Sequence, residues 1–340
     1  MNWIESDSDE NNYADTLISF ANNNWYDWIV LADDLVINLL NNKIVDEAIF
    51  LKLLPLTKIQ NRYMLSSKKG LSDFCVSNEI ETPGFCMYNN SNDLETIKTN
   101  LNFPIINKIN FSFGGTDMFI SHSFDEFLSN IHKIPENKNI FIQEFISGEE
   151  ISVEALFCNG ELVTYLNSNV LNYSSTIFSY TTRRNYYENV ELKPLLIELG
   201  KKLGLNGFAS IVYLYKKINN KYYLIEVDPR PNSWMANSRF IADNDFINGL
   251  KKIISGEYKN GFQSMNIKRE NVEVALFYKD IRRAIWQKDW KGIFRWILNK
   301  EKYWKFLPLY DLKLAKRIYI EIWNEVVVTK WNKTFKSENE

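Results

Sequence analysis

Apolar residues recur at helical spacing in the first third of the chain and alternate with polar residues at strand spacing in the middle. The two periods distinguish helices from half-buried strands. Helices are predicted from Tyr13 onward and at residues 35–40, 46–54, 68–77, 124–134 and 192–203. Strands are predicted at residues 103–123 (two strands), 139–145, 151–157, 161–166, 209–216 and 222–227. Asn159–Gly160 and Asn219–Asn220 predict two hairpins among the later strands.

Two further segments complete this pattern. Residues 25–34 (WYDWIVLADD) are an apolar run that predicts a buried parallel strand ending in Asp33 and Asp34. From about Phe246 the pattern is mostly helical, with Lys and Arg between tryptophans. Its default interpretation is a packed amphipathic core, and a membrane-surface or partner-binding face is the alternative. This region holds six of the ten tryptophans: Trp286, Trp290, Trp296, Trp304, Trp323 and Trp331.

Composition excludes several classes of function. The chain has 340 residues, 45% of them hydrophobic, and a net charge of -2, so no general attraction to nucleic acid is expected. Two histidines, His122 and His132, are too few for a typical His-based zinc site or a Ser-His-Asp triad. No apolar run is long enough to span a membrane. Three cysteines at unrelated spacings, without a leader-like start, predict free thiols and a cytoplasmic location.

Residues 222–239 (YYLIEVDPRPNSWMANSR) carry the densest chemistry. Side chains two apart on a strand share a face, so Glu226 and Asp228 are expected to point the same way. Arg230 and Asn232 follow, between and after prolines that keep the backbone extended. Two carboxylates, a guanidinium and an amide suit a divalent cation and the phosphate oxygens that it bridges. The alternative is an edge strand that ends in a solvated polar turn.

Two other segments could serve a nucleotide. Lys108 lies in a predicted strand directly before FSFGG, whose backbone N–H groups could cradle phosphate. A strand-edge lysine beside a turn is the alternative. Residues 141–156 (FIQEFISGEEISVEAL) could offer backbone groups to an adenine and a carboxylate to a ribose. A charged hairpin rim is the alternative there.

Together these pieces resemble the ATP-grasp superfamily. Lys68 after Ser-Ser, Lys108 before FSFGG, QEFISGEEISV and IEVDPRPNSW stand in that family's order, from about Lys58 to Phe240. The chain is most similar to the branch near biotin carboxylase and the predicted carboxylate–amine ligases. The resemblance implies an α+β ATP-grasp fold, in which two β-rich subdomains clasp a nucleotide. It implies a short pre-ATP-grasp α/β unit at 1–65, the ATP-grasp domain at 66–260 and a helical, Trp-rich extension at 261–340.

The resemblance also implies roles for individual residues. Lys68 and Lys108 would contact the phosphates of ATP, and Glu226 and Asp228 would hold Mg²⁺ or Mn²⁺. Arg230, with Lys108 and Asn232, would act on the transferred phosphoryl group and the substrate. The remaining cofactor-binding positions would be Ser112, Gly114 and Gly115 in the phosphate loop, Gln143, Glu144, Phe145 and Ile146 at the adenine hinge, and Glu150 at the ribose.

The implied reaction activates a carboxylate with ATP as an acyl phosphate, which an amine then attacks, releasing ADP and phosphate. Arg183 and Arg184 would contact substrate, with a solvated basic turn as the alternative. The partners would be small-molecule carboxylates and amines, and a homodimer is left open.

Three departures from the family keep a second function open. Val212 stands where relatives carry another metal-binding acid, and bulky Phe113 lies in the phosphate loop. The segment before Lys58 has no Gly-rich first turn. The second function is a degenerate ATP-grasp protein that binds MgATP and acts as a regulatory or scaffolding module.

Overall fold

The computed structural model describes residues 9–23, 26, 28–111, 118–133, 139–237, 241, 245–258, 271–298 and 311–324. Contacts divide the chain into two compact units. Unit 1 comprises Met1–Asn167 and Glu188–Lys268, and unit 2 comprises Ser168–Tyr187 and Arg269–Glu340. This division differs from the three domains expected from the sequence, since the first 65 residues belong to unit 1 and a short inner segment belongs to unit 2.

Unit 1 begins with three helices, α1 (Glu10–Asn23), α2 (Asp34–Lys43) and α3 (Glu47–Leu53). Asp33 caps α2 by accepting a hydrogen bond from the N–H of Leu35, as its residue type favours. The predicted strand at 25–34 is wrong: residue 26 and residues 28–33 adopt neither helix nor strand. A strand needs a neighbour for its backbone groups, and no strand of the described chain pairs with this segment. Ile29 and Leu31 nevertheless pack against the core, which explains the apolar run.

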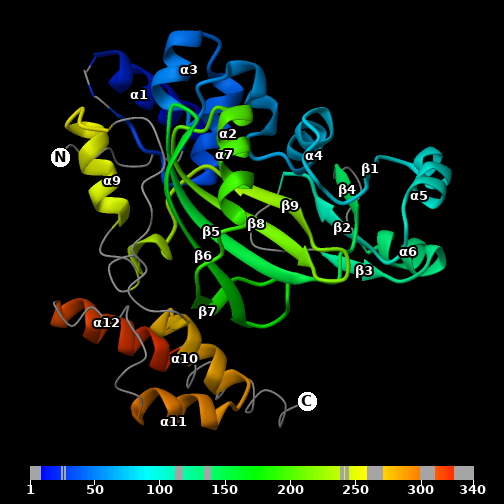
Figure 1. Ribbon diagram of the computed structural model, residues 1–340. Coiled ribbons are helices and arrows are strands. Elements are labelled where there is room, and N and C mark those ends of the chain that lie inside the picture. Colours follow the sequence, from blue (N-terminus) through cyan, green and yellow to red (C-terminus); the bar gives the residue numbers. More distant parts are fainter. Residues whose placement is uncertain are drawn as a thin grey trace. The chain divides into compact units, whose positions relative to one another are not determined.

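The larger sheet of unit 1 is built from two hairpins (Figure 1). Its strands lie in the order β6 (Glu161–Tyr173), β5 (Glu149–Cys158), β8 (Gly207–Lys216) and β9 (Lys221–Asp228). Asn159 and Gly160 both have positive φ in the first turn, which confirms the hairpin predicted there.

The two faces of this sheet differ in chemistry. Alternate residues of β5 and β8, such as Val153 and Ile211, are fully buried against helix α7 (Leu192–Leu203) and the N-terminal helices. Helix α7 begins and ends at the predicted residues. The opposite face carries polar side chains in register, with Glu154 beside Ser210 and Ser210 beside Asp228. One face therefore makes the core while the other is free to carry chemistry.

A second, four-stranded antiparallel sheet lies in unit 1. Helices α5 (Leu94–Asn100) and α6 (Phe124–Ile131) pack on the face that carries Ile105 and Ile142. The opposite face carries Lys108 and Gln143. Helix α4 (Lys68–Ser77) precedes this sheet, and α9 (Asp245–Ile254) comes late in the unit. The sheet order is β1 (Phe85–Tyr88), β4 (Ile140–Glu144), β2 (Ile105–Ile109) and β3 (Phe119–Ser121).

Unit 2 contains the end of β6 from Ser168, which pairs with β7 (Thr181–Tyr186), which in turn pairs with β10 (Val272–Ala275). Its helices are α10 (Phe277–Trp286), α11 (Trp290–Leu298) and α12 (Leu312–Trp323).

Three tryptophans of unit 2 do not follow the packed-core expectation. Trp286, Trp290 and Trp323 are each more than half exposed. Trp304 and Trp331 lie outside the described residues. A membrane or partner contact at this surface stays a prediction. Among the described helices, none has the length and apolar character to cross a bilayer.

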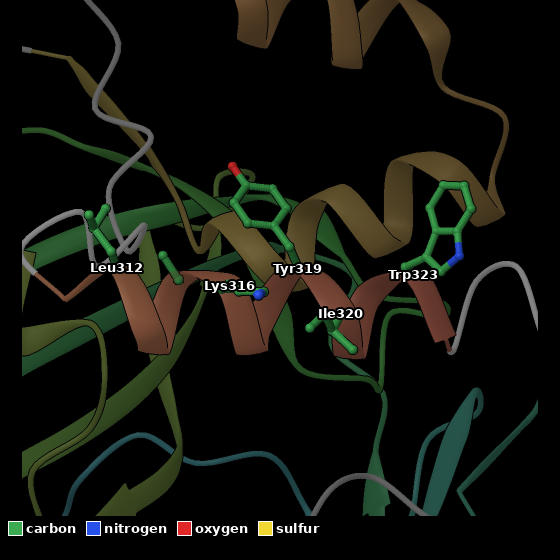
Figure 2. A pocket seen from close by; sticks show the side chains of 6 residues that line it. Leu312, Lys316, Tyr319, Ile320 and Trp323 are labelled. Atoms are coloured by element: carbon green, nitrogen blue, oxygen red, sulfur yellow. The ribbon is translucent and has the colours of Figure 1, made fainter.

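A shallow hollow runs along α12 (Figure 2). Its lining is almost entirely apolar, with Lys316 as the one charged residue. No residue expected to bind nucleotide lies in it. The other lining residues are Leu312, Ala315, Tyr319, Ile320 and Trp323.

Gly204 ends α7 in the left-handed conformation, with φ of 76°. A Cβ there would lie 2.7 Å from the hydroxyl of Thr57 and 3.1 Å from the backbone nitrogen of Lys58. We expect Gly204→Ala to lower the free energy of unfolding by about 2 kcal/mol, since backbone strain and crowding add. Gly256 is a matched control, because it has a similar φ of 71° and nothing near its missing Cβ. Urea unfolding should show about half that loss for Gly256→Ala; equal losses would remove crowding from the explanation.

Candidate active site

The two acids of β9 lie on one face, as their spacing predicts. Glu226 pairs with Val212 across the hairpin, and Asp228 pairs with Ser210. Glu226 is exposed, whereas Asp228 is partly covered. Burial, followed by the charges of Glu226 and Asp34, raises the pKa of Asp228 well above its usual value, while Arg230 and Lys68 oppose the rise. Such a carboxylate is poised to bind a cation, because a cation relieves the repulsion between the acids.

Two lysines come to this site from the other sheet and from α4. Lys108 is on β2, and Lys68 is the first residue of α4. Asn110 ties the two elements together, because its side-chain oxygen accepts from the N–H of Lys69 at 2.8 Å. The hydroxyl of Ser67 caps α4 by accepting from the N–H of Gly70. The end of β2 and the start of α4 are thus held side by side.

The charges of nearby acids act on both lysines. Burial of the ammonium group, followed by the nearby charge of Lys68, lowers the pKa of Lys108 to about 8, although Glu226 and Glu150 raise it. Burial likewise lowers the pKa of Lys68, against the charges of Glu226 and Asp228. Half-buried cations in this state gain from an added anion.

Gln143 orients Lys108 by accepting a hydrogen bond from its Nζ at 2.8 Å. The next residues are the predicted adenine hinge. The N–H groups of Glu144 and Phe145 donate to the carbonyls of Gly84 and Pro104, both at 2.8 Å. An adenine at this hinge would therefore meet the carbonyl of Glu144 rather than its N–H, together with the N–H of Ile146. The carboxylate of Glu144 accepts from Asn102, which fixes the hinge from the other side.

Arg230 follows β9 directly and forms an ion pair that the sequence did not predict. Its Nη2 lies 2.6 Å from Oδ2 of Asp34 and 3.4 Å from Oδ2 of Asp228. Burial disfavours the charged guanidinium, but the hydrogen bond with Asp34 and the charge of Asp228 keep the pKa of Arg230 above its usual value. Asp34 is the site residue that sequence reasoning missed. The sequence had singled out Asp33 and Asp34 together, but nothing in it connected them to Arg230.

Asn232 shapes the chain after Arg230. Its Nδ2 donates to the hydroxyl of Ser210 at 3.0 Å, and its Oδ1 accepts from the N–H of Trp234 at 2.9 Å. Asn232 therefore fastens the turn after Arg230 to strand β8. The predicted phosphate-loop residues Ser112, Gly114 and Gly115 lie outside the described residues.

The residues present fit a divalent cation that takes most of its ligands from phosphates and water. Glu226 and Asp228 supply hard carboxylate oxygens on one face, and Val212 occupies the neighbouring position across the hairpin. Among the described residues no group of three or more His, Cys, Asp or Glu side chains is placed to hold a metal. Two acids suit Mg²⁺ bound together with a nucleotide rather than alone.

Arg183 and Arg184 lie in unit 2, on β7, and both are buried. Nη2 of Arg183 lies 2.6 Å from Oδ2 of Asp280, and Nη1 lies 3.1 Å from Oε1 of Glu273. Asp280 also accepts from Nε of Arg283 at 2.7 Å. The alternative of a solvated basic turn is therefore wrong. The ion pairs of Arg183 hold β7 to β10 and α10, and its predicted contact with substrate stays a prediction.

Comparison with known proteins identifies the fold. A family model described as an ATP-grasp domain matches residues 66–233. That stretch contains both lysines, the hinge, the acids of β9, Arg230 and Asn232. The chain belongs to the ATP-grasp superfamily.

Relatives of this ATP-grasp chain support the assignment. A carbamoyl-phosphate synthase of Methanobrevibacter smithii is 27% identical over 142 residues, which are 40% of this chain and 38% of the synthase. The chain thus spans well under half of that relative. Two crystal structures share the fold. An L-amino acid ligase from Bacillus licheniformis has a TM-score of 0.56 and 16% identity, covering 74% of this chain and 63% of the ligase. An N5-carboxyaminoimidazole synthetase from Staphylococcus aureus, complexed with ADP, has a TM-score of 0.57 and 13% identity, covering 86% and 84%.

The lowered pKa of Lys108 predicts how ATP affinity depends on pH. Phosphate binds the ammonium form, which is fully populated well below pH 8 and is lost as pH rises through about 8. We expect ATP affinity to fall between pH 7.5 and 9.5, by at most about tenfold per pH unit, because binding must then include protonation. Lys108→Met should bind more weakly and with a flatter pH profile. Calorimetric titrations at several pH values test this, and identical profiles for the two proteins would contradict the role of Lys108.

The ion pairs of Arg183 predict a loss of stability rather than of binding. Arg183→Met leaves Asp280 with fewer donors in a fully buried position. We expect the free energy of unfolding to fall by about 3 kcal/mol. Nucleotide affinity of the folded variant should match the parent protein in calorimetric titrations with MgATP. A variant of full stability that responds differently to added substrates would instead favour the substrate contact.

Proposed function

We propose that this protein is a magnesium-dependent, ADP-forming ligase that joins a carboxylate to an amine. The carrying observation is that half-buried Lys68 lies within electrostatic reach of Glu226 and Asp228, and half-buried Lys108 within reach of Glu226 and Glu150, inside an ATP-grasp domain. Cations that gain from an anion stand close to carboxylates that gain from a metal ion. A magnesium-bound triphosphate satisfies both sets of groups at once.

Each residue has a chemical task in this proposal. Magnesium-bound ATP supplies the phosphoryl group that activates the carboxylate. Lys68 and Lys108 bind phosphate oxygens, and Gln143 keeps the ammonium of Lys108 directed at them. Glu226 and Asp228 would hold the cation. Arg230 stabilises negative charge on the carboxylate side, since a guanidinium pairs well with planar anions and phosphates. Phosphoryl transfer needs positioning and charge neutralisation rather than a covalent nucleophile.

The substrates belong to the proposal as classes only. A carboxylate would be activated, and an amine would displace phosphate from the acyl phosphate. An L-amino acid ligase from Bacillus licheniformis has the same fold, which supports the proposal of a ligase. We also propose a cytoplasmic location, which is supported by the three cysteines, Cys75, Cys86 and Cys158, all free thiols in the structure.

One observation favours a second function. The structure pairs Val212 directly with Glu226, so the position where the superfamily carries a further metal-binding acid holds an apolar side chain. A site with fewer ligands could bind the nucleotide and not complete the transfer. The second candidate is therefore an ATP-binding regulatory or scaffolding module.

A phosphate-release screen separates the two candidates. Purified protein is incubated with MgATP and pairs drawn from amino acids, other small carboxylates and amines, and inorganic phosphate is measured. The ligase proposal expects release that requires both a carboxylate and an amine and that drops at least about a hundredfold in Lys108→Met. MgATP binding by calorimetry without release for any pair would favour the regulatory module. Failure to bind any purine nucleotide would overturn both.

A further inference from the structure

A single nitrogen of Arg230 serves two carboxylates. Its Nη2 lies 2.6 Å from Asp34 and 3.4 Å from Asp228. The first distance is that of a strong charge-assisted hydrogen bond, and the second is at the limit for any hydrogen bond. All three side chains are more buried than exposed. The guanidinium is therefore held mainly by Asp34, which comes from the N-terminal helix α2 rather than from the matched ATP-grasp residues.

The main chain fixes the position of the Cα atom of Arg230 but not the position of its guanidinium group. Pro229 and Pro231 restrict the backbone on both sides, and the N–H of Arg230 donates to the carbonyl of Asp228 at 2.8 Å. Nε of Arg230 is buried and makes no hydrogen bond within the described chain. The two carboxylates are thus the anchors that orient the guanidinium.

These two anchors have different tasks if the site binds a metal-bound nucleotide. Asp228 is proposed to give its oxygens to the cation, and a guanidinium on the same oxygens competes with that cation. Asp34 belongs to helix α2 and is not one of the proposed metal-binding acids, so it can hold the guanidinium in place of Asp228. If Asp34 holds the guanidinium and Asp228 binds the cation, Nη2 of Arg230 should lie farther from Asp228 than from Asp34, as it does.

We infer that Asp34 is a positioning residue, which holds the guanidinium of Arg230 off Asp228 so that Asp228 can bind the divalent cation. The inference rests on the proposed function, because it requires a metal-bound nucleotide at this site. Asp34 also keeps Arg230 next to the place where the acyl phosphate would form. The N-terminal helices would thereby contribute to metal affinity without touching the metal.

A double-mutant cycle read out by metal binding tests the inference. Mn²⁺ is titrated in the presence of fixed ADP, and free Mn²⁺ is measured by electron paramagnetic resonance. ADP is the probe because it lacks the transferred γ-phosphoryl group that Arg230 is proposed to contact. Asp34→Asn should raise the Mn²⁺ concentration at half-saturation at least about threefold, because Arg230 then turns fully to Asp228. In an Arg230→Gln background, Asp34→Asn should have no further effect.

Several outcomes would overturn the inference. An equal shift in both backgrounds would mean that Asp34 acts only as a distant negative charge. No shift from Asp34→Asn in the protein that retains Arg230 would leave Asp34 without a role. Arg230→Gln alone tests the competition without changing Asp34: it should leave Mn²⁺ binding unchanged or tighter, and weaker binding would overturn the idea.

Asp33→Asn is the matched control. It removes the same charge one residue away, and Asn can still cap α2 through Leu35. Its Mn²⁺ titration should match that of the parent protein, and a shift as large as that of Asp34→Asn would count against a specific role. Failure of the parent protein to retain Mn²⁺ with ADP would overturn the proposed function itself, whereas parent binding with an unchanged Asp34→Asn variant would overturn only the inference.

Discussion

Partial burial of two ammonium groups near carboxylates is the constraint on which the chemistry of unit 1 depends. An ammonium ion removed from water is strongly destabilised unless an opposite charge or a hydrogen-bond acceptor replaces the lost solvent. Lys108 has both, an amide oxygen at 2.8 Å and the charges of Glu226 and Glu150. The repulsion from Lys68 remains, so the compensation is incomplete. An anion that binds next to these two incompletely compensated cations would therefore gain favourable free energy.

The same constraint explains why two sheets are needed. The acids come from the end of a hairpin, where alternation places Glu226 and Asp228 on one face, and the lysines come from β2 and the start of α4. The sheet with β2 supplies Lys108 to the site, whereas the sheet with β9 supplies the two acids. Asn110 joins the lysine-bearing elements, and the Asp34–Arg230 pair joins helix α2 to the acid-bearing strand. The nucleotide would supply the remaining link.

Much of this was predictable because it is local. Strand alternation predicted the shared face of the two acids, and helix α7 was evident from periodicity. Long-range pairings were not predictable in this way. Arg183 meets Asp280, 97 residues away, and Asp34 meets Arg230 from the end of a segment whose apolar run predicts a strand. Periodicity indicates whether a side chain is buried, but it does not indicate which residue far along the chain forms an ion pair with it.

The shared core of unit 1 has a practical meaning for anyone who trims this chain. Phe50 and Leu40 of the N-terminal helices are completely buried in the cluster that also contains Leu196 and Val153. A fragment that begins at residue 66, where the family match begins, would lack the N-terminal helices. The remaining aliphatic side chains of that cluster would then be exposed to water. The smallest piece suited to recombinant production therefore begins upstream of α1. The residues that match a family model need not include every residue of the hydrophobic core, and a fragment for expression must keep that core intact.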